Sequence, residues 1–212
     1  MINLVKGANV NLSKTAPTTT IYRVGLSWDV KQDSTETHDF DLDTVAMLTD
    51  SNGKGLTVEN VHFYNNIDGS GTTSATHYAT MTYQESLIEA EKLAANTFAV
   101  TTKDNQNGEG SGDDETLFIN GSKIGENQKV IVAVNIYEAD IRKQIFGKVK
   151  NAMCKVYDVD GTVIAQYELG EDFAIETGVL VGEFYCHNGE VKFRATGTGF
   201  TGNLNKLITQ HV

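Results

Sequence analysis

The residues with the strongest chemical signature form an acidic loop at positions 104–115. Its twelve residues include five acids, two Asn and three Gly, and none of them is hydrophobic. Carboxylates packed this closely repel one another unless a cation binds among them. Hard oxygen ligands on a glycine-rich backbone are the ligands that Ca²⁺ selects. The composition of this acidic loop therefore indicates a calcium site.

A second group of acids, Asp39, Asp41 and Asp43, precedes an apolar run. Alternate residues of a strand face the same side, so Asp41 and Asp43 would lie about 7 Å apart on one face. Leu42 would then point into the core. Two carboxylates this close require a cation or a raised pKa, unless they are simply two solvated acids at the end of a strand. Asp39 is either a third oxygen source or a turn residue.

The acidic loop has the length of an EF-hand loop and ends in Glu115, but its other positions do not fit that motif. Glu109 stands at the sixth position, where the sharp turn needs Gly, and no helical pattern follows the loop. A calcium site between the loops of a β-fold fits better. Asp113, Asp114 and Glu115 cannot all bind one ion from one backbone path, so we expect two ligands and one residue that holds the loop.

Weaker signals surround these two groups. Asn65 and Asn66 add amide oxygens at the end of a predicted strand, although alone they indicate only a turn. Zinc is not favoured, because the five His residues are scattered without ligand spacing. Mg²⁺ is a weaker candidate than Ca²⁺, since it prefers few carboxylates and keeps its waters.

The elements that must position these residues are mostly strands. Period-two alternation predicts strands at 22–28, 45–48, 61–64, 117–119, 130–137, 153–159, 163–169, 179–186 and 191–196. Asn188-Gly189 between the last two predicts a hairpin. Strong helix formers predict a helix at 83–95, and a short helix is expected at 141–146. The pattern predicts an all-β fold, a β-sandwich of antiparallel strands with short helical insertions.

Bulk properties limit the class of protein. The 212 residues suit one domain, and a net charge of −11 without a basic stripe argues against nucleic-acid binding. No apolar segment approaches the length of a membrane span, so no direct membrane insertion is expected, and the first residues do not resemble a signal peptide. A cytoplasmic protein is therefore expected. Cys154 and Cys186 lie in apolar runs and are expected to be buried free thiols rather than a disulfide.

Taken in order, the motifs resemble the TerD-domain family of tellurium-resistance and stress-response proteins. The pieces that carry this resemblance cover nearly the whole chain. They are residues 4–14 (LVKGANVNLSK), 24–29 (VGLSWD), 40–43 (FDLD), 63–66 (FYNN), 104–105 (DN), 108–115 (GEGSGDDE), 146–152 (FGKVKNA) and 182–185 (GEFY).

The resemblance implies a β-sandwich that binds Ca²⁺ through acidic loops and has no established catalytic activity. It also implies a bacterial or phage setting in tellurite, phage or stress resistance, with other stress-response or membrane-associated proteins as partners. The oligomeric state stays open. Carried over position by position, the metal-ligand candidates are Asp41, Asp43, Asn65, Asn66, Asp104, Asn105, Asp113, Asp114 and Glu115.

The chain departs from the family pattern at one place. Residues 72–102 intervene between the Asn65-Asn66 segment and the acidic loop, and Lys103 stands where Gly is usual. We therefore expect a single domain over 1–212 with a helix-containing insertion at about 72–102. The insertion could cover the site, recruit a partner or decorate the surface.

Two other functions use the same residues differently. A hydrolase acting on a glycan could use a carboxylate pair such as Asp43 and Asp114. Sugar sites usually offer several stacking aromatics, however, and Trp28 is the only Trp. Thiol chemistry on tellurite through Cys154 and Cys186 is not favoured, because neither lies in a Cys-x-x-Cys motif or beside an obvious cation.

Overall fold

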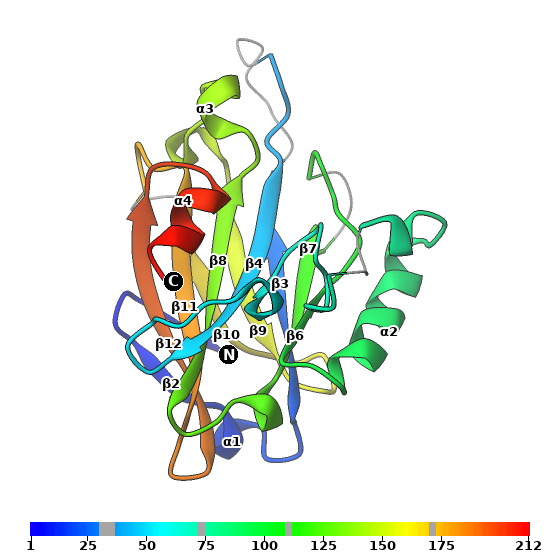
Figure 1. The fold of residues 1–212 in the computed structure, drawn as a ribbon, viewed down its shortest axis with the longest axis vertical. Coiled ribbons are helices and arrows are strands. Elements are labelled where there is room, and N and C mark those ends of the chain that lie inside the picture. Colours follow the sequence, from blue (N-terminus) through cyan, green and yellow to red (C-terminus); the bar gives the residue numbers. More distant parts are fainter. Residues whose placement is uncertain (30–36, 72–74, 109–111, 170–172) are drawn as a thin grey trace.

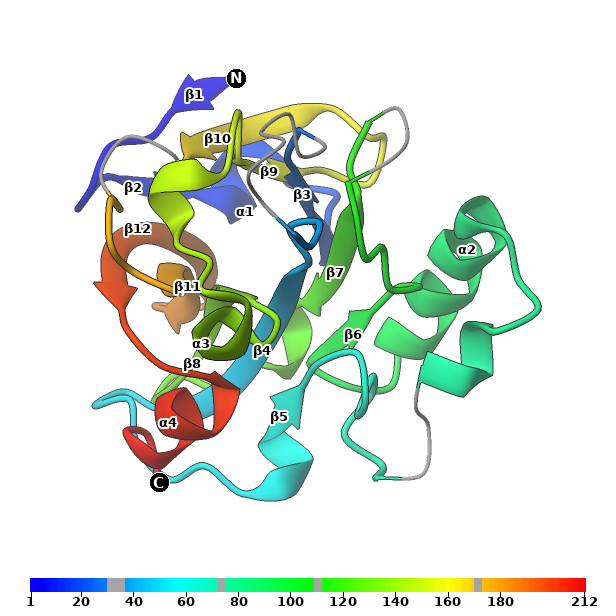
Figure 2. The same cartoon turned by 90° about the horizontal axis from the view of Figure 1, so that it is seen from above.

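The fold consists of two packed β-sheets (Figures 1 and 2). The computed structural model describes residues 1–29, 37–71, 75–108, 112–169 and 173–212. Within them, the first sheet has the strand order β1-β10-β9-β3-β7-β6 and the second has the order β2-β12-β11-β8-β4-β5. Among the described residues, all pairings between these strands are antiparallel except that of β1 with β10. The predicted all-β sandwich is confirmed.

The strands have the following bounds. The first sheet contains β1 (Ile2–Asn3), β3 (Ile21–Ser27), β6 (Ala99–Thr101), β7 (Glu115–Asn120), β9 (Met153–Tyr157) and β10 (Val163–Glu168). The second sheet contains β2 (Asn9–Asn11), β4 (Leu42–Asp50), β5 (Val61–His62), β8 (Gln128–Ile136), β11 (Gly178–His187) and β12 (Glu190–Phe200).

The core lies between the two sheets. It is filled by alternate side chains of the central strands, among them Tyr22, Leu26, Val132 and Phe184, all almost completely buried. Because successive side chains of a strand face opposite sides, the same strands send their other residues to the outer faces. The alternation that predicted these strands is therefore the alternation that fills the core.

Short helices decorate the sandwich. They are α1 (Leu12–Thr15), α2 (Tyr83–Ala94), α3 (Ala139–Arg142) and α4 (Leu204–Thr209). The predicted helix at 83–95 is confirmed as α2, which begins with a capping box between Thr82 and Glu85. The predicted helix at 141–146 begins earlier and ends at Arg142, followed by a 3-10 turn at Phe146–Lys148.

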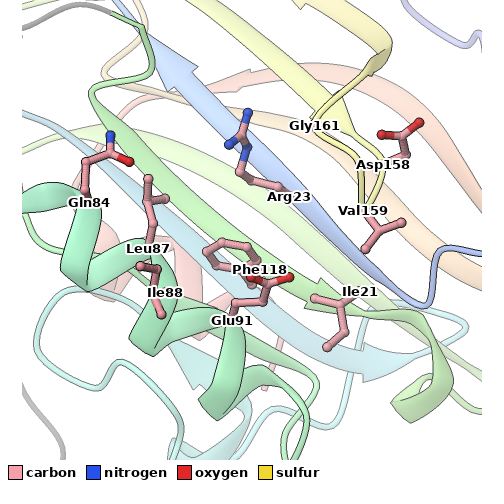
Figure 3. A pocket seen from close by; sticks show the side chains of 10 residues that line it. All are labelled: Ile21, Arg23, Gln84, Leu87, Ile88, Glu91, Phe118, Asp158, Val159 and Gly161. Carbon is pink, nitrogen blue, oxygen red and sulfur yellow. The ribbon is translucent and has the colours of Figure 1, made fainter.

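Helix α2 lies against the outer face of the first sheet, beside β6 and β7 (Figures 1 and 2). Its buried Ala90 and Ala94 pack with Phe118 and Val100 in an apolar cluster separate from the main core. A groove of about 220 Å³ runs between α2 and β3, with Leu87, Phe118 and Arg23 among its walls (Figure 3). The part of the expected insertion that the structure describes thus packs on the sandwich; residues 72–74 lie outside that part.

The hairpin at Asn188-Gly189 is confirmed. It joins β11 to β12 with His187 opposite Glu190, and both turn residues have positive φ, 55° and 73°. Positive φ at both central positions is the requirement of a type I′ turn, which the Asn-Gly pair meets.

The cysteines are free, as expected, but only Cys154 is buried. Cys186 lies near the end of β11, where the sheet is half exposed, so the expectation of two buried thiols is wrong for that residue. Among the described residues, none of the helices is both long and apolar enough to span a bilayer.

Candidate metal centre

The acids converge where one edge of each sheet meets the other. Strand β4 lies next to the edge strand β5 of the second sheet, and β7 lies next to the edge strand β6 of the first. Contacts of β4 with β6 and β7 bring these strands together. Acidic side chains from 41–43 and from the acidic loop therefore meet although about sixty residues separate them in the sequence.

Asp41 and Asp43 enter the site from β4 and the residue before it. Leu42 between them is completely buried in the core, as the alternation predicted. Asp43 lies opposite Asn135 of β8, whose Nδ2 donates a hydrogen bond of 3.3 Å to Asp43 Oδ2. The backbone carbonyl of Asp41 accepts from the N–H of Tyr137 at 2.8 Å. Strand pairing with β8 thus fixes both acids.

Asp104 enters from the loop that follows β6. Its Oδ2 accepts from Gln106 Nε2 at 3.1 Å. The next residue, Asn105, shapes the loop, because its Oδ1 accepts from the N–H groups of Asn107 and Gly108 at 3.2 and 3.1 Å. Gly108 has φ of 70° and lies against the ring of Trp28, where a Cβ would be 2.6 Å from Nε1. A glycine is required at that position.

Glu115 lies behind these three acids. It is the first residue of β7, and its side chain crosses to the second sheet, where Oε2 accepts from the N–H of Thr44 at 2.7 Å. It is almost completely buried. The hydrogen bond therefore ties the two sheets together at the site.

Three acids come close enough to share one ion. One carboxylate oxygen from each of Asp41, Asp43 and Asp104 lies within 4.8 Å of the others. The three line a small cavity of about 140 Å³ together with Tyr64, Gln106, Tyr137 and Arg142. Asp104 Oδ1 is buried and accepts no hydrogen bond from any part of the chain that the structure describes. A buried carboxylate oxygen without a donor is costly, and a bound cation would satisfy it.

The cluster strongly disfavours its own ionisation. Burial first, and then the charge of Asp104, raise the pKa of Asp41 to about 7. Burial and the neighbouring Asp41 and Asp104 raise the pKa of Asp43 well above its usual range. Burial, followed by Asp43 and Asp104, does the same to the pKa of Glu115. A cation would reverse these effects by stabilising the charged forms.

The structure does not bring Asp113 to this cluster. Its carboxylate lies on the other side of the first sheet, over Gly25, where a Cβ would overlap it. There Oδ1 accepts from the hydroxyl of Tyr157 at 2.9 Å, and Lys155 and Arg23 lie 3.7 and 4.0 Å away. The neighbours of Asp113 are thus two cations and a phenol.

Asp114 holds the loop to the sandwich. Its Oδ2 accepts from the backbone N–H of Trp28 at 3.0 Å, and its Oδ1 accepts from Asn105 Nδ2 at 3.3 Å. Burial raises the pKa of Asp114. The side chains of Asp114 and Asn105 are therefore used in positioning the loop that carries Asp104.

Neither Asn65 nor Asn66 lines the cavity. Asn66 uses its amide within a turn, because Nδ2 donates to the carbonyl of Val61 at 2.8 Å and Oδ1 accepts from the N–H of Gly71 at 3.1 Å. Asn65 is exposed. Residues 109–111 of the acidic loop, Glu109 among them, lie outside the described residues.

Four lining residues were not candidates from the sequence: Tyr64, Gln106, Tyr137 and Arg142. The position of Tyr64 was signalled indirectly, because it directly precedes the Asn65-Asn66 pair. Gln106 lies in the acidic loop itself. Tyr137 and Arg142 reach the site from the end of β8 and from α3, and no local signal in the sequence marks them.

The other hollows of the described chain carry different chemistry. The groove beside α2 is lined by apolar residues, such as Leu87 and Phe118, and by charged ones, Arg23, Glu91 and Asp158 (Figure 3). A hollow of about 440 Å³ between residues 59–70 and 93–98 is lined by both polar and apolar residues. Within the described residues, Asp41, Asp43 and Asp104 form the one group of three His, Cys, Asp or Glu side chains arranged to hold a metal ion.

Comparison with known proteins gives a consistent picture. The family model of the TerD domain matches residues 1–101 and 82–211. The tellurium resistance protein TerD of Serratia marcescens is 41% identical over 212 residues, which cover 99% of this chain and 96% of that protein. General stress protein 16U of Bacillus subtilis (strain 168) is 36% identical over 213 residues, 99% and 96% of the two chains.

A solved structure shares the fold. The crystal structure of a homologue of telluride resistance protein from Streptomyces coelicolor A3(2) superposes with a TM-score of 0.64 at 18% identity, covering 89% of this chain and 95% of that one. At that identity the likeness concerns the fold alone. The named relatives are described as resistance and stress proteins, not as enzymes.

Proposed function

This chain belongs to the TerD domain family of tellurium-resistance and stress-response proteins, and we propose that it acts there as a non-enzymatic calcium-binding protein. In this proposal Asp41, Asp43 and Asp104 supply carboxylate ligands, and Glu115 adds negative charge behind them. The observation that carries it is the approach of three carboxylate oxygens to within 4.8 Å of one another, from the buried Asp41 and Asp43 and the half-buried Asp104.

The donors fit a hard divalent ion. All are carboxylates, and the cavity leaves room for additional oxygen ligands such as water, which Ca²⁺ needs to reach six to eight. Asp104 Oδ1 is buried and has no hydrogen-bond donor among the described residues, so a bound cation would satisfy it. Zinc would want nitrogen or sulfur ligands, and Mg²⁺ would want stricter octahedral geometry with more retained water.

Binding would order the loops at this end of the sandwich. The ion would join β4 of one sheet to the loop after β6 of the other, and hydrogen bonds of Asn105 and Asp114 hold that loop. We propose that this ordered edge, which includes α3 with its exposed Ile141, is the surface presented to another stress-response protein. Calcium would then control partner binding through loop order.

The glycan-hydrolase alternative has less support. Asp114 already accepts hydrogen bonds at both carboxylate oxygens, from Trp28 N–H and Asn105. The ring of Trp28 is buried and donates to the carbonyl of Phe40 at 3.1 Å, so it offers no stacking surface for a sugar. Neither Asp114 nor Trp28 is therefore free to act on a glycan.

A thermal scan of metal-stripped protein tests the proposal. Ca²⁺ binds only the folded arrangement of ligands, so a hundredfold excess over Kd should stabilise the protein by about 2.7 kcal/mol and raise the Tm. Asp104→Asn should abolish most of this rise. An unchanged Tm at millimolar Ca²⁺ would contradict the proposal.

Asp113→Asn is the matched control. It removes one carboxylate from the same acidic loop, but from the outer face of the first sheet. Its calcium-induced rise in Tm should equal that of the wild type. If Asp113→Asn loses the response and Asp104→Asn keeps it, the ion is bound elsewhere in the loop.

A further inference from the structure

The cavity of the proposed metal centre already contains a cation of the protein's own. Arg142 of α3 lines it, with only 17% of its side chain exposed, and Arg142 Nη1 lies 3.6 Å from Asp41 Oδ2. The guanidinium also lies 4.9 Å from the ring centre of Tyr137, and its Nε is 3.7 Å from Glu138. Contacts on three sides hold it at the mouth of the cavity.

The charge of Arg142 acts on the proposed ligands. It works against burial and the other acids by lowering the pKa of both Asp41 and Asp43. A positive charge that favours the carboxylate forms in this way also repels a second cation placed among the same oxygens. Arg142 and a divalent ion therefore compete for the negative charge of one site.

We propose that Arg142 is a built-in counter-cation that Ca²⁺ must displace from Asp41, so that it sets the calcium concentration at which the site fills. This inference rests on the proposed function. At 3.6 Å, Arg142 Nη1 and Asp41 Oδ2 are farther apart than the roughly 2.7–2.9 Å of a close charge-assisted hydrogen bond, which makes the ion pair loose enough to exchange. Glu138, 44% exposed at its side chain, is placed to receive the released guanidinium.

The exchange would couple the ion to α3. This helix is a single turn, flanked by Glu138 and Lys143 in the left-handed region with φ of 50° and 55°. Gln144, just beyond it, donates to the carbonyls of His38 and Asp39, so the approach to Asp41 and the end of α3 stay joined when the Arg142 pair opens. Displacement of Arg142 would thus change the charge presented on α3 without detaching the helix.

Isothermal titration of metal-stripped protein with CaCl₂ tests the inference. Arg142→Gln should bind Ca²⁺ roughly tenfold more tightly than the wild type, because the competing charge is removed. Arg142→Lys, which keeps the charge but loses the planar fork, should fall between the two. Lys143→Gln removes the neighbouring exposed charge and should change Kd by less than about twofold, because solvent screens it.

A second readout follows the guanidinium directly. In the wild type, Ca²⁺ should shift the Nε–Hε resonance of Arg142, whereas a residue that merely supports Asp41 would keep its resonance. Weaker or unchanged binding by Arg142→Gln, or an unmoved resonance, overturns the inference while leaving the proposed function intact. If the wild type itself binds no Ca²⁺, the proposed function fails and the inference fails with it.

Discussion

Asp43 of β4 stands directly opposite Asn135 of β8, and the Asn135 amide donates to its carboxylate at 3.3 Å. Asn135 Oδ1 is buried and has no partner among the described residues, so the amide is committed to Asp43. This hydrogen bond fixes the orientation of the buried Asp43 carboxylate. Without it, Asp43 would face two other acids with no neutral donor.

The first prediction concerns removal of that acid. Asp43→Asn should make the protein without metal more stable at pH 8, by about 1–3 kcal/mol. The substitution removes a buried carboxylate whose charged form is disfavoured, and each unit by which its pKa is raised corresponds to about 1.4 kcal/mol. It should also abolish the stabilisation by Ca²⁺. Urea unfolding with and without a chelator measures both effects.

Asp50→Asn, at the other end of β4, is the control. The N–H of Lys54 and neighbouring groups lower the pKa of Asp50, so its charge is favoured by the fold. Its neutralisation should lower stability and leave the calcium response unchanged. If Asp43→Asn is also destabilising in chelator, the repulsion inferred among the acids is absent.

The second prediction concerns pH. The pKa of Asp41 is raised to about 7, and those of Asp43 and Glu115 are raised as well, so the folded state binds more protons than the unfolded chain. The stability contributed by these groups is complete below about pH 4 and is lost as the pH rises through about 7. The Tm in chelator should therefore fall over that range.

Calcium should change this profile. The ion binds the deprotonated carboxylates, so its stabilisation should grow as the pH rises and should offset the loss. Thermal scans at several pH values, with chelator or with saturating Ca²⁺, give the two curves. Parallel curves would mean that the titrating acids do not hold the ion.

The third prediction concerns the loop that carries Asp104. Gly108→Ala places a Cβ against Trp28, whose ring donates to the carbonyl of Phe40, next to Asp41. The clash should cost about 1–3 kcal/mol in addition to the strain of positive φ, and should weaken calcium binding by moving both acids. Denaturation followed by Trp28 fluorescence, together with calcium titration, measures it.

Gly112→Ala separates the clash from the backbone strain. Gly112 also has positive φ, 103°, but a Cβ there would meet none of the described atoms within 4 Å. It should show the cost of the backbone conformation with little effect on Trp28. Equal losses in the two variants would show that Trp28 does not position the site.

The fourth prediction separates α2 from the metal centre. Phe118 packs under α2 on the outer face of β7 (Figure 3). Phe118→Ala should destabilise the fold by about 3–5 kcal/mol through the cavity it leaves. The calcium Kd should stay within about twofold, since the acids lie on the other side of the sheet. A parallel loss of affinity would place α2 and its cluster among the supports of the site.

Local pattern predicted much of the fold. Strands with strong alternation, the Asn188-Gly189 hairpin and α2 with its capping box could all be placed from the sequence. The short strands β1, β2 and β6 could not, because two or three residues give no periodicity and only their partners define them. Helices α1 and α4 are likewise short and lack a strong local signal.

The sequence indicated that the candidate site would consist of acidic residues, but not which of the acids would meet there. That Asp41 and Asp104 meet depends on the order of β4, β5, β6 and β7 across two sheets, which no local pattern contains. Within the acidic loop, Asp113 and Glu115 lie two positions apart on opposite sides of the first sheet, because the chain enters β7 between them. Arg142 was not foreseen, since its role depends on the placement of α3.

The most direct test of the calcium site is a crystal structure of the protein grown with Ca²⁺ and examined for anomalous density. The ion should lie among Asp41, Asp43 and Asp104, with carboxylate oxygens at about 2.3–2.6 Å. Density beside Asp113 on the outer face, or three carboxylates with only water between them at saturating Ca²⁺, would contradict the account.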